Sequence, residues 1–210
     1  KMDAVIKEET IHENGWEHLE PFSGEGAILV TAHFGYWELT AVKVAERYEK
    51  ISVYAERQSN RYSDEFIRRH RERYGVYSCY DFEGIRTLLD QLAEGQFVGI
   101  LNDQREGNNF HWVPFFSRAV KTPRILPFLA RKSQSPVVPI SAYQNEDGIQ
   151  LQLFEPLKTS LETMEDEDDE ISLLKEYHQW LESQIESHPE QYFWFHKRFK
   201  NSKPIDHENS

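Results

Sequence analysis

The sequence predicts an α/β fold with a mostly parallel, mixed sheet flanked by helices. Short apolar runs of strand length recur along the chain, segments with apolar residues at helical spacing separate them, and a hairpin-type turn joins the last two runs. The 210 residues suit a single domain with a sizeable core. We expect residues 1–25 to form a polar lead-in and residues 200–210 a flexible tail.

The first half of the chain alternates between predicted strands and helices. The apolar run at 27–32 is the first strand, and apolar side chains at helical spacing predict a helix over 37–48. A further strand is expected at 51–55. Residues 62–74 are amphipathic and rich in arginine, which indicates a surface helix, and 76–79 is a short strand.

The middle of the chain supplies a capped helix and a second buried strand. Asp81 is a suitable N-cap for a helix over 83–94, because its carboxylate can accept hydrogen bonds from N–H groups of the first turn. Gly95 ends this helix, and the apolar run at 97–101 is a strand. Polar residues follow this strand at its carboxyl end, where open α/β sheets carry their ligand sites.

The second half of the chain is predicted to contain two more helices and a hairpin. Thr122 followed by Pro123 is typical of an N-cap and first turn, and predicts a helix that runs to about Lys132. The acidic run at 165–170 favours a solvated loop and helix start, where carboxylates interact favourably with the helix dipole. Two further strands are predicted at residues 136–142 and 149–154, with a turn at 145–148 between them. A long helix is predicted at residues 169–187.

Composition excludes several classes of protein. The net charge of −12 argues against general nucleic-acid binding. Cys79 is the lone cysteine, which excludes an internal disulfide and a Cys-rich zinc site, and we interpret it as a buried spectator. No apolar run approaches the roughly 18 residues that span a bilayer, so we expect the chain itself to be soluble. It begins with Lys1, which is consistent with a removed N-terminal membrane anchor.

A histidine at the end of the first predicted strand is the leading catalytic candidate. His33 closes the strand, Gly35 allows a ligand to approach the backbone, and Glu38 lies one helical turn further on. Histidine titrates near neutrality, and a carboxylate can fix its tautomer and stabilise its protonated form. We therefore predict that His33 is a general base oriented by Glu38. The alternative is a structural histidine; a metal site is disfavoured because no second histidine lies nearby in a ligand pattern.

Two further groups of charged residues are candidate binding sites. Asp103 follows the strand at 97–101 and either binds a polar group of a substrate or caps the loop, and Arg105 beside it is placed to contact phosphate. Arg68 and Arg71 are our choices within the arginine-rich helix, which would bind an acidic carrier protein, a coenzyme phosphate or lipid headgroups. The alternative is a solvated helix face whose arginines pair with glutamates at helical spacing.

The C-terminal segment is aromatic and basic. Trp194, His196 and Arg198 alternate, which predicts that they share one face of a strand with phenylalanines opposite. We interpret this segment as packing on the sheet rather than as part of the catalytic machinery.

The stretch from His33 to Glu38 also resembles a known motif. His33-Phe-Gly-Tyr-Trp-Glu38 is similar to the His-x4-Glu/Asp motif of glycerolipid-type acyltransferases, and looks most like that of the bacterial lipid A late acyltransferases, the lauroyl/myristoyl transferase family. Tyr36 stands where an Asn is usual and Ser117 where a Gly is usual, and we expect Tyr36 to mark a difference in acceptor binding. The resemblance covers about residues 14–200, and the further matching stretches, in order, are Gly99-Ile-Leu-Asn-Asp-Gln104, Val113-Pro-Phe-Phe116 with Ala119 and Thr122-Pro123, Leu129-Ala-Arg131 with Pro136-Val-Val-Pro139, and Tyr192-Phe-Trp-Phe-His-Lys-Arg-Phe199.

The resemblance implies an O-acyltransferase of lipid A biosynthesis that needs no cofactor. It would move a fatty acyl chain from acyl carrier protein, or coenzyme A, to a hydroxyl of a lipid acceptor, a lipid A precursor, at the cytoplasmic face of the inner membrane. His33 would act as base without a covalent acyl-enzyme, and backbone N–H groups after His33 or an arginine would stabilise the oxyanion. The alternatives are an acyl-thioesterase or lipid hydrolase, an acyltransferase for another lipid such as a glycerolipid or aminolipid, and a non-catalytic lipid- or carrier-binding module.

Overall fold

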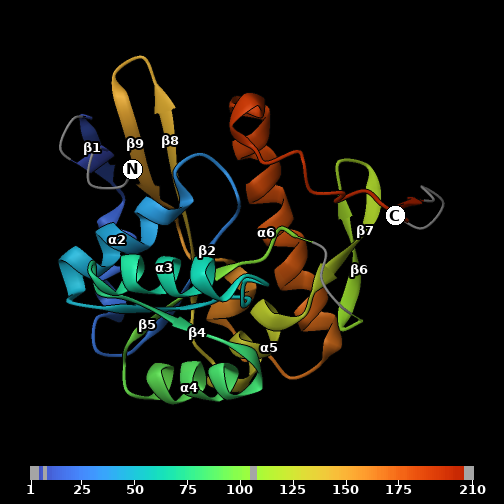
Figure 1. Ribbon diagram of the computed structural model, residues 1–210. Coiled ribbons are helices and arrows are strands. Elements are labelled where there is room, and N and C mark those ends of the chain that lie inside the picture. Colours follow the sequence, from blue (N-terminus) through green and yellow to red (C-terminus); the bar gives the residue numbers. More distant parts are fainter. Residues whose placement is uncertain (1–4, 7–8, 105–107, 206–210) are drawn as a thin grey trace.

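A seven-stranded sheet forms the centre of the computed structural model, which describes residues 5–6, 9–104 and 108–205 (Figure 1). Its strands are β1 (Ile11–Asn14), β2 (Ala27–Thr31), β3 (Ile51–Tyr54), β4 (Val76–Cys79), β5 (Phe97–Leu101), β8 (Val137–Asn145) and β9 (Gly148–Leu153). They lie in the order β1-β9-β8-β2-β5-β3-β4. β8 and β9 are antiparallel and the other neighbours are parallel, so the predicted mixed, mostly parallel sheet is confirmed.

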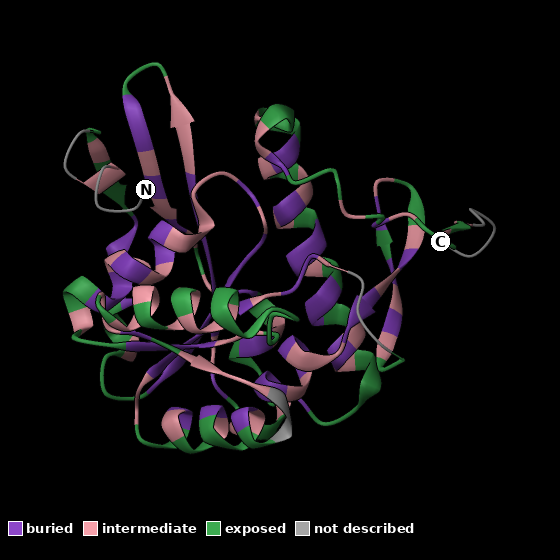
Figure 2. Cartoon of the chain, viewed as in Figure 1, coloured by how far each residue is buried: buried purple, intermediate pink, exposed green. Residues whose placement is uncertain are grey.

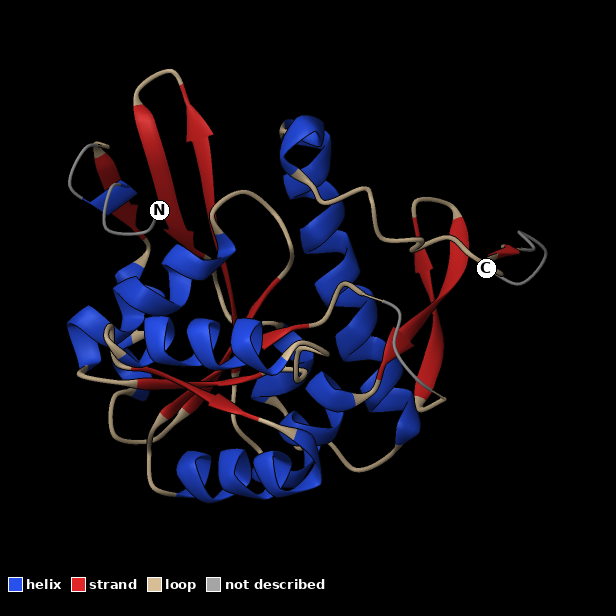
Figure 3. Ribbon diagram, viewed as in Figure 1, coloured by secondary structure: helices blue, strands red, loops and turns tan. Residues whose placement is uncertain are grey.

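Helices cover both faces of this sheet (Figure 3). Successive side chains of a strand point to opposite faces; accordingly Ile28 and Val30 of β2 belong to one buried core, and Ala27 and Leu29 belong to another. α2 (Trp37–Tyr48) packs into the core that contains Leu29. The core that contains Ile28 is completed by α4 (Asp81–Ala93), α5 (Ile125–Ser133) and α6 (Glu167–Ser187). Short 3-10 helices lie at η1 (Trp16–His18), η2 (Glu20–Phe22), η3 (Lys158–Leu161) and η4 (Pro189–Gln191).

The arginine-rich helix α3 (Arg61–Glu72) lies on the surface and has no buried residue. Figure 1 places it beside α2, and Figure 2 shows only exposed and intermediate positions along it. Asn60 caps it, because the Asn60 side chain accepts hydrogen bonds from the backbone N–H groups of Tyr62 and Ser63 at 2.9 and 3.2 Å. Among the helices within the described ranges, none has the length and apolar character that crossing a bilayer requires.

A second, three-stranded sheet was not predicted. It consists of β6 (Phe110–Phe115), β7 (Arg118–Pro123) and β10 (Lys203–Pro204), in the order β10-β7-β6. The prediction that Thr122 and Pro123 open a helix is therefore wrong, because both residues end β7 and α5 begins at Ile125. Proline is tolerated there because the end of a strand does not need its missing N–H group.

A two-residue turn joins β6 to β7, and both of its residues have left-handed backbone conformations. Phe116 has a φ of 45° and Ser117 a φ of 61°, values that favour glycine. We expect Ser117→Gly to stabilise the fold by about 1 kcal/mol, because glycine adopts this conformation without the steric cost of a Cβ atom. Urea unfolding measures the change. Ser133→Gly, at the last residue of α5, is the control that should destabilise, because it removes the hydrogen bond from Ser133 Oγ to the Leu129 carbonyl. Equal midpoints for Ser117→Gly and the parent chain would contradict the expectation.

Several other boundaries differ from the sequence-based expectation. Tyr80, not Asp81, occupies the N-cap position of α4. The predicted alternation of Trp194, His196 and Arg198 on a strand is wrong, because this segment forms turns in which Trp194 is half exposed and Arg198 is buried. β1 lies within the expected lead-in and pairs in parallel with β9. Its sequence, Ile-His-Glu-Asn, contains a single apolar residue and so gave no strand signal.

The acidic run before α6 includes one carboxylate that is buried rather than solvated. Asp166 is the N-cap of α6, and its side chain accepts hydrogen bonds from first-turn N–H groups. Glu170, however, is fully buried and lies 2.8 Å from His111 Nε2 and 2.8 Å from Arg131 Nε, while Arg124 donates to it at 3.0 Å. Burial alone would raise the pKa of Glu170, but these hydrogen bonds and the Arg124 charge outweigh it and lower the pKa.

Glu170→Gln should destabilise the fold by roughly 3 kcal/mol, because it removes the negative charge that joins α5, α6 and β6. The guanidinium groups of Arg124 and Arg131 would then lack the carboxylate that compensates their charge. Because the pKa of Glu170 is lower in the folded protein than its ordinary value of 4.5, the ionised carboxylate stabilises the fold at pH values above 4.5. This stabilisation is lost as the pH falls through the pKa that Glu170 has in the folded protein. Thermal unfolding of the variant should therefore depend less on pH in this acidic range. Glu167→Gln is the matched control, since Glu167 also pairs with Arg124 but is largely exposed. Equal losses in both variants would contradict the assignment.

Candidate active site

Two neighbouring parallel strands bring His33 and Asp103 together. β2 and β5 pair in register with Thr31 opposite Leu101, and each polar residue comes two positions after its strand ends. The carboxyl ends of both strands therefore deliver their side chains to one edge of the sheet. Nδ1 of His33 lies 2.9 Å from Oδ1 of Asp103. The Asp103 side chain is 2% exposed and that of His33 is 26% exposed, so the imidazole presents its other nitrogen, Nε2, to solvent or substrate.

Asp103 is buried among aromatic hydroxyls and a guanidinium group. Burial is the main cause of the raised pKa of Tyr177 and of Tyr192, and the negative charge of Asp103 raises both further. These hydroxyls are therefore neutral donors at physiological pH, and Tyr177 donates to the carbonyl oxygen of Thr31 at 3.0 Å. Arg198 supplies the positive charge near Asp103. Neither tyrosine was predicted as a site residue: Tyr177 lies in no recognisable motif, and Tyr192 begins the matching stretch at 192–199, which was interpreted as packing on the sheet.

Arg198 is held by contacts that leave it little freedom. Its Nη2 atom donates to Thr122 Oγ1 at 3.0 Å and to His178 Nε2 at 2.9 Å. Burial, helped by the Arg198 charge, lowers the pKa of His178 to about 3, so this histidine is neutral and accepts the bond. Arg198 is thus a fixed, buried positive charge within the protein, and it does not share a strand face with Trp194 and His196 as predicted.

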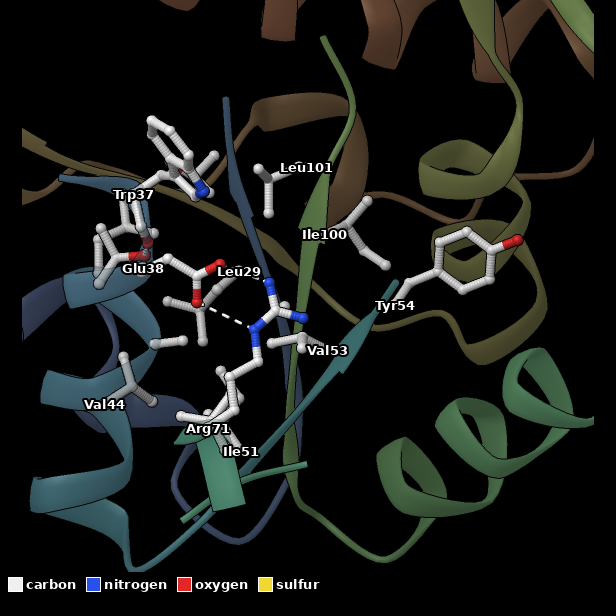
Figure 4. Close-up of a pocket in the computed structure, with 16 residues that line it drawn as sticks. Leu29, Trp37, Glu38, Val44, Ile51, Val53, Tyr54, Arg71, Ile100 and Leu101 are labelled. Carbon is white, nitrogen blue, oxygen red and sulfur yellow. Dashed lines mark hydrogen bonds and ion pairs between the residues drawn. The ribbon is translucent and has the colours of Figure 1, made fainter. Parts of the chain in front are cut away.

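Glu38 has a different partner from the one predicted. It lies in the first turn of α2, and Arg71 of α3 donates to it from Nε at 2.9 Å and also from Nη2 (Figure 4). Arg71 also donates to Ser78 Oγ at 3.1 Å. Burial lowers the pKa of Arg71, but the bond to Glu38 outweighs that effect and raises it. The ion pair between Glu38 and Arg71 therefore joins the surface helix α3 to α2. The carboxylate that hydrogen-bonds to His33 is that of Asp103.

A cavity of about 520 Å³ opens beside the imidazole and lies within the usual size range of ligand sites. Its lining includes His33, Trp37, Glu38 and Arg71 together with apolar and aromatic residues of α3. A much smaller crevice of about 40 Å³ lies between α2 and the sheet (Figure 4). Both spaces are lined in part by Trp37, Glu38, Tyr54, Arg71 and Leu101, so the Glu38–Arg71 pair lies where the larger cavity meets the smaller crevice.

Two other predicted site residues, Tyr36 and Arg68, have partners elsewhere in the protein. Tyr36 donates from its hydroxyl to Gln144 Oε1 of β8 at 3.2 Å. Arg68 forms ion pairs with Glu65 and Glu72 of its own helix at 2.9 and 2.6 Å. Neither residue is among those that line the cavity within the described ranges. Arg105 lies outside the described residues.

The loop after His33 is fixed by backbone contacts. The N–H groups of Phe34, Gly35 and Tyr36 donate to backbone carbonyls of Ala32, Gln191 and Ala142, so these three donors are already used within the protein. Gly35 has a φ of 52°, and a Cβ atom there would lie 2.2 Å from the Ala142 carbonyl oxygen. Glycine is therefore required at position 35 because the backbone of β8 approaches it closely, and not, as predicted, because a ligand does.

The C-terminal segment closes over the same loop. Phe193 N–H donates to the His33 carbonyl at 2.9 Å, and Phe34 pairs with Tyr192 in an isolated antiparallel bridge. The rings of Trp37 and Phe193 flank the imidazole at centroid distances of 5.3 and 6.2 Å. The segment therefore does more than pack on the sheet, because Phe193 also lies against the imidazole ring of His33.

The chain is similar to known proteins along nearly its whole length. The family model described as bacterial lipid A biosynthesis acyltransferase matches residues 4–201. Lipid A biosynthesis acyltransferase 2 of Shigella flexneri is 23% identical over 194 residues, which cover 90% of this chain and 60% of that protein. Lipid A biosynthesis myristoyltransferase of Escherichia coli (strain K12) is 24% identical over 199 residues, which cover 90% of this chain and 59% of that protein. The chain spans about three-fifths of the length of these curated relatives.

Proposed function

The chain belongs to the bacterial lipid A biosynthesis acyltransferase family, and from this premise we propose that it transfers a fatty acyl chain from the thioester of an acyl carrier protein, or of coenzyme A, to a hydroxyl of a lipid A precursor. The observation that carries the proposal is the 2.9 Å contact between His33 and Asp103 at the wall of the large cavity. The expected place of reaction is the cytoplasmic face of the inner membrane.

His33 is the proposed general base. Its Nε2 atom takes the proton of the acceptor hydroxyl as the oxygen attacks the thioester carbonyl. The tetrahedral intermediate then collapses, the carbon–sulfur bond breaks, and the imidazolium returns the proton to the leaving thiolate. Asp103, rather than Glu38, is the proposed orienting group, because its carboxylate lies on Nδ1, where it fixes the tautomer and stabilises the imidazolium.

Glu38 and Arg71 have a proposed role in shaping the substrate site. Their ion pair lies between the large cavity and the apolar crevice under α2, where it would determine how far an acyl chain can enter. The positive end of α2, whose first turn carries Trp37 and Glu38, is the proposed source of oxyanion stabilisation, since the backbone donors of residues 34–36 are occupied. Tyr36, Arg68 and Arg105 remain predictions for substrate binding.

The decisive assay separates acyl transfer from hydrolysis. Acyl carrier protein loaded with a fatty acyl chain is incubated with and without a lipid A precursor, and thiol release and lipid mass are measured together. We expect thiol release to require the acceptor and to match the amount of acylated lipid formed. Acceptor-independent release at the full rate would instead establish a thioesterase or lipid hydrolase. Parallel reactions with acyl coenzyme A, a glycerolipid and an aminolipid identify the donor and the acceptor.

A further inference from the structure

Exposed aromatic side chains gather at the rim of the active-site cavity. Of the seven large hydrophobic residues that are exposed in the described part of the chain, five lie in two groups. The first group is on α3, where Tyr62 and Phe66 are one turn apart and are 79% and 71% exposed. The second group follows α6 and consists of Phe193, Trp194 and Phe195.

Each group lies next to the residues that line the cavity. Phe66 of the first group lines the cavity together with His33. Phe193 belongs to the second group, and its ring centroid is 6.2 Å from that of His33. Phe195 contacts Phe193 at a centroid distance of 5.7 Å and is itself 90% exposed. An apolar phase that covered both groups would therefore lie close to His33 and the cavity that it lines.

The charge of the second group differs from that of the whole chain. Residues 191–203 include four basic residues and no acidic residue, although the chain has a net charge of −12. Lys197, Lys200 and Lys203 are exposed, while the fourth basic residue, Arg198, is buried. Aromatic rings beside lysines are typical of surfaces that lie at the interface between water and a lipid bilayer, because the rings enter the headgroup region and the ammonium groups bind lipid phosphates.

From these observations we propose that the two aromatic groups form a docking surface for an anionic lipid bilayer, which places the cavity entrance against the membrane. This inference rests on the proposed function, since it explains how a lipid acceptor would reach His33 without crossing water. An acidic protein partner fits the lysines but leaves the exposed rings unexplained, since charged surfaces alone do not require them.

Vesicle binding tests the docking surface without any acyl donor. Tyr62→Ser combined with Phe195→Ser removes one exposed ring from each group, and neither residue lines the cavity. We expect the partition onto phosphatidylglycerol-containing vesicles to fall by at least about 10-fold, because each ring loses its apolar contact with lipid. Lys197→Gln combined with Lys200→Gln should weaken binding by about 5-fold per lysine on these vesicles and have no effect on pure phosphatidylcholine.

Leu161→Ser is the matched control. Leu161 is 57% exposed and ends η3, which precedes α6, whereas Phe193 follows α6. Its substitution should leave vesicle binding unchanged. Lipids with brominated acyl chains should quench tryptophan fluorescence in the parent chain, and Trp194→Phe should abolish most of that quenching.

Two results would overturn the docking surface. One is an equal loss of vesicle binding in the Leu161 control and the aromatic double variant. The other is unchanged vesicle binding in the double variant together with weaker binding to acyl carrier protein, which would assign the surface to a protein partner. His33→Ala should bind vesicles as the parent chain does, so the vesicle result does not depend on the acyl-transfer proposal. A protein that transfers acyl chains but does not bind vesicles would refute the docking surface and leave the proposed function intact.

Discussion

Replacement of His33 by alanine should lower the rate of acyl transfer by roughly 10²–10⁴-fold, because the acceptor hydroxyl would keep its proton during attack on the thioester. The His33 side chain is 26% exposed and its backbone carbonyl makes the contact with Phe193, so the loop should keep its place without the imidazole. Initial rates at saturating acceptor, together with a thermal unfolding curve, measure the two effects separately.

His70→Ala is the matched control for this experiment. His70 lines the same cavity from α3 and stacks on Phe66, but no described carboxylate bonds to it. Its loss should therefore change the rate far less than the loss of His33. A His33→Ala protein that is folded and fully active would refute the base mechanism, and an inactive His70→Ala protein would move the base to α3.

Asp103→Asn should reduce kcat by a comparable factor, about 10²–10⁴-fold, with little change in KM. The amide keeps the shape of the carboxylate but removes the charge that stabilises the imidazolium, and it can turn the imidazole into the wrong tautomer. The effect should appear in kcat because the charge on His33 develops only as the reaction proceeds.

Glu38→Gln separates the two carboxylates. Glu38 bonds to Arg71, and a glutamine would retain one of these hydrogen bonds. We expect this variant to alter KM and the preferred acyl chain more than kcat. If instead Glu38→Gln lost kcat as strongly as Asp103→Asn did, Glu38 would be the orienting group after all. Circular dichroism of both variants confirms that equal amounts of folded protein are compared.

Local patterns in the sequence were sufficient for most of the fold. The helix predicted over residues 37–48 has the same bounds in the structure, because its apolar spacing faces a continuous core. The hairpin turn at 145–148 joins β8 and β9 as expected. The hairpin of β6 and β7 was missed, because its turn residues, Phe116 and Ser117, carry no glycine or asparagine signal.

The candidate site was predictable in part. His33 and Asp103 were both recognised as polar residues at strand ends, but their pairing depends on the adjacency of β2 and β5, which are far apart in the sequence. Proximity along the chain favoured Glu38 instead. In the structure Glu38 lies in the first turn of α2 and bonds to Arg71, a contact that depends on how α3 packs beside α2.

The hydrogen bond between Phe193 and His33 makes the site depend on the order of synthesis. Residues 191–193 pair with residues 33–35, so the loop that carries the proposed base is fixed in part by a segment that is synthesised only after α6. Contacts between such distant positions form late, because the intervening chain must first close a long loop. A nascent chain that has completed α6 would still lack the contacts of Gly35 and of the His33 carbonyl with residues 191–193. The proposed base would then reach its final surroundings only once translation has passed Phe193.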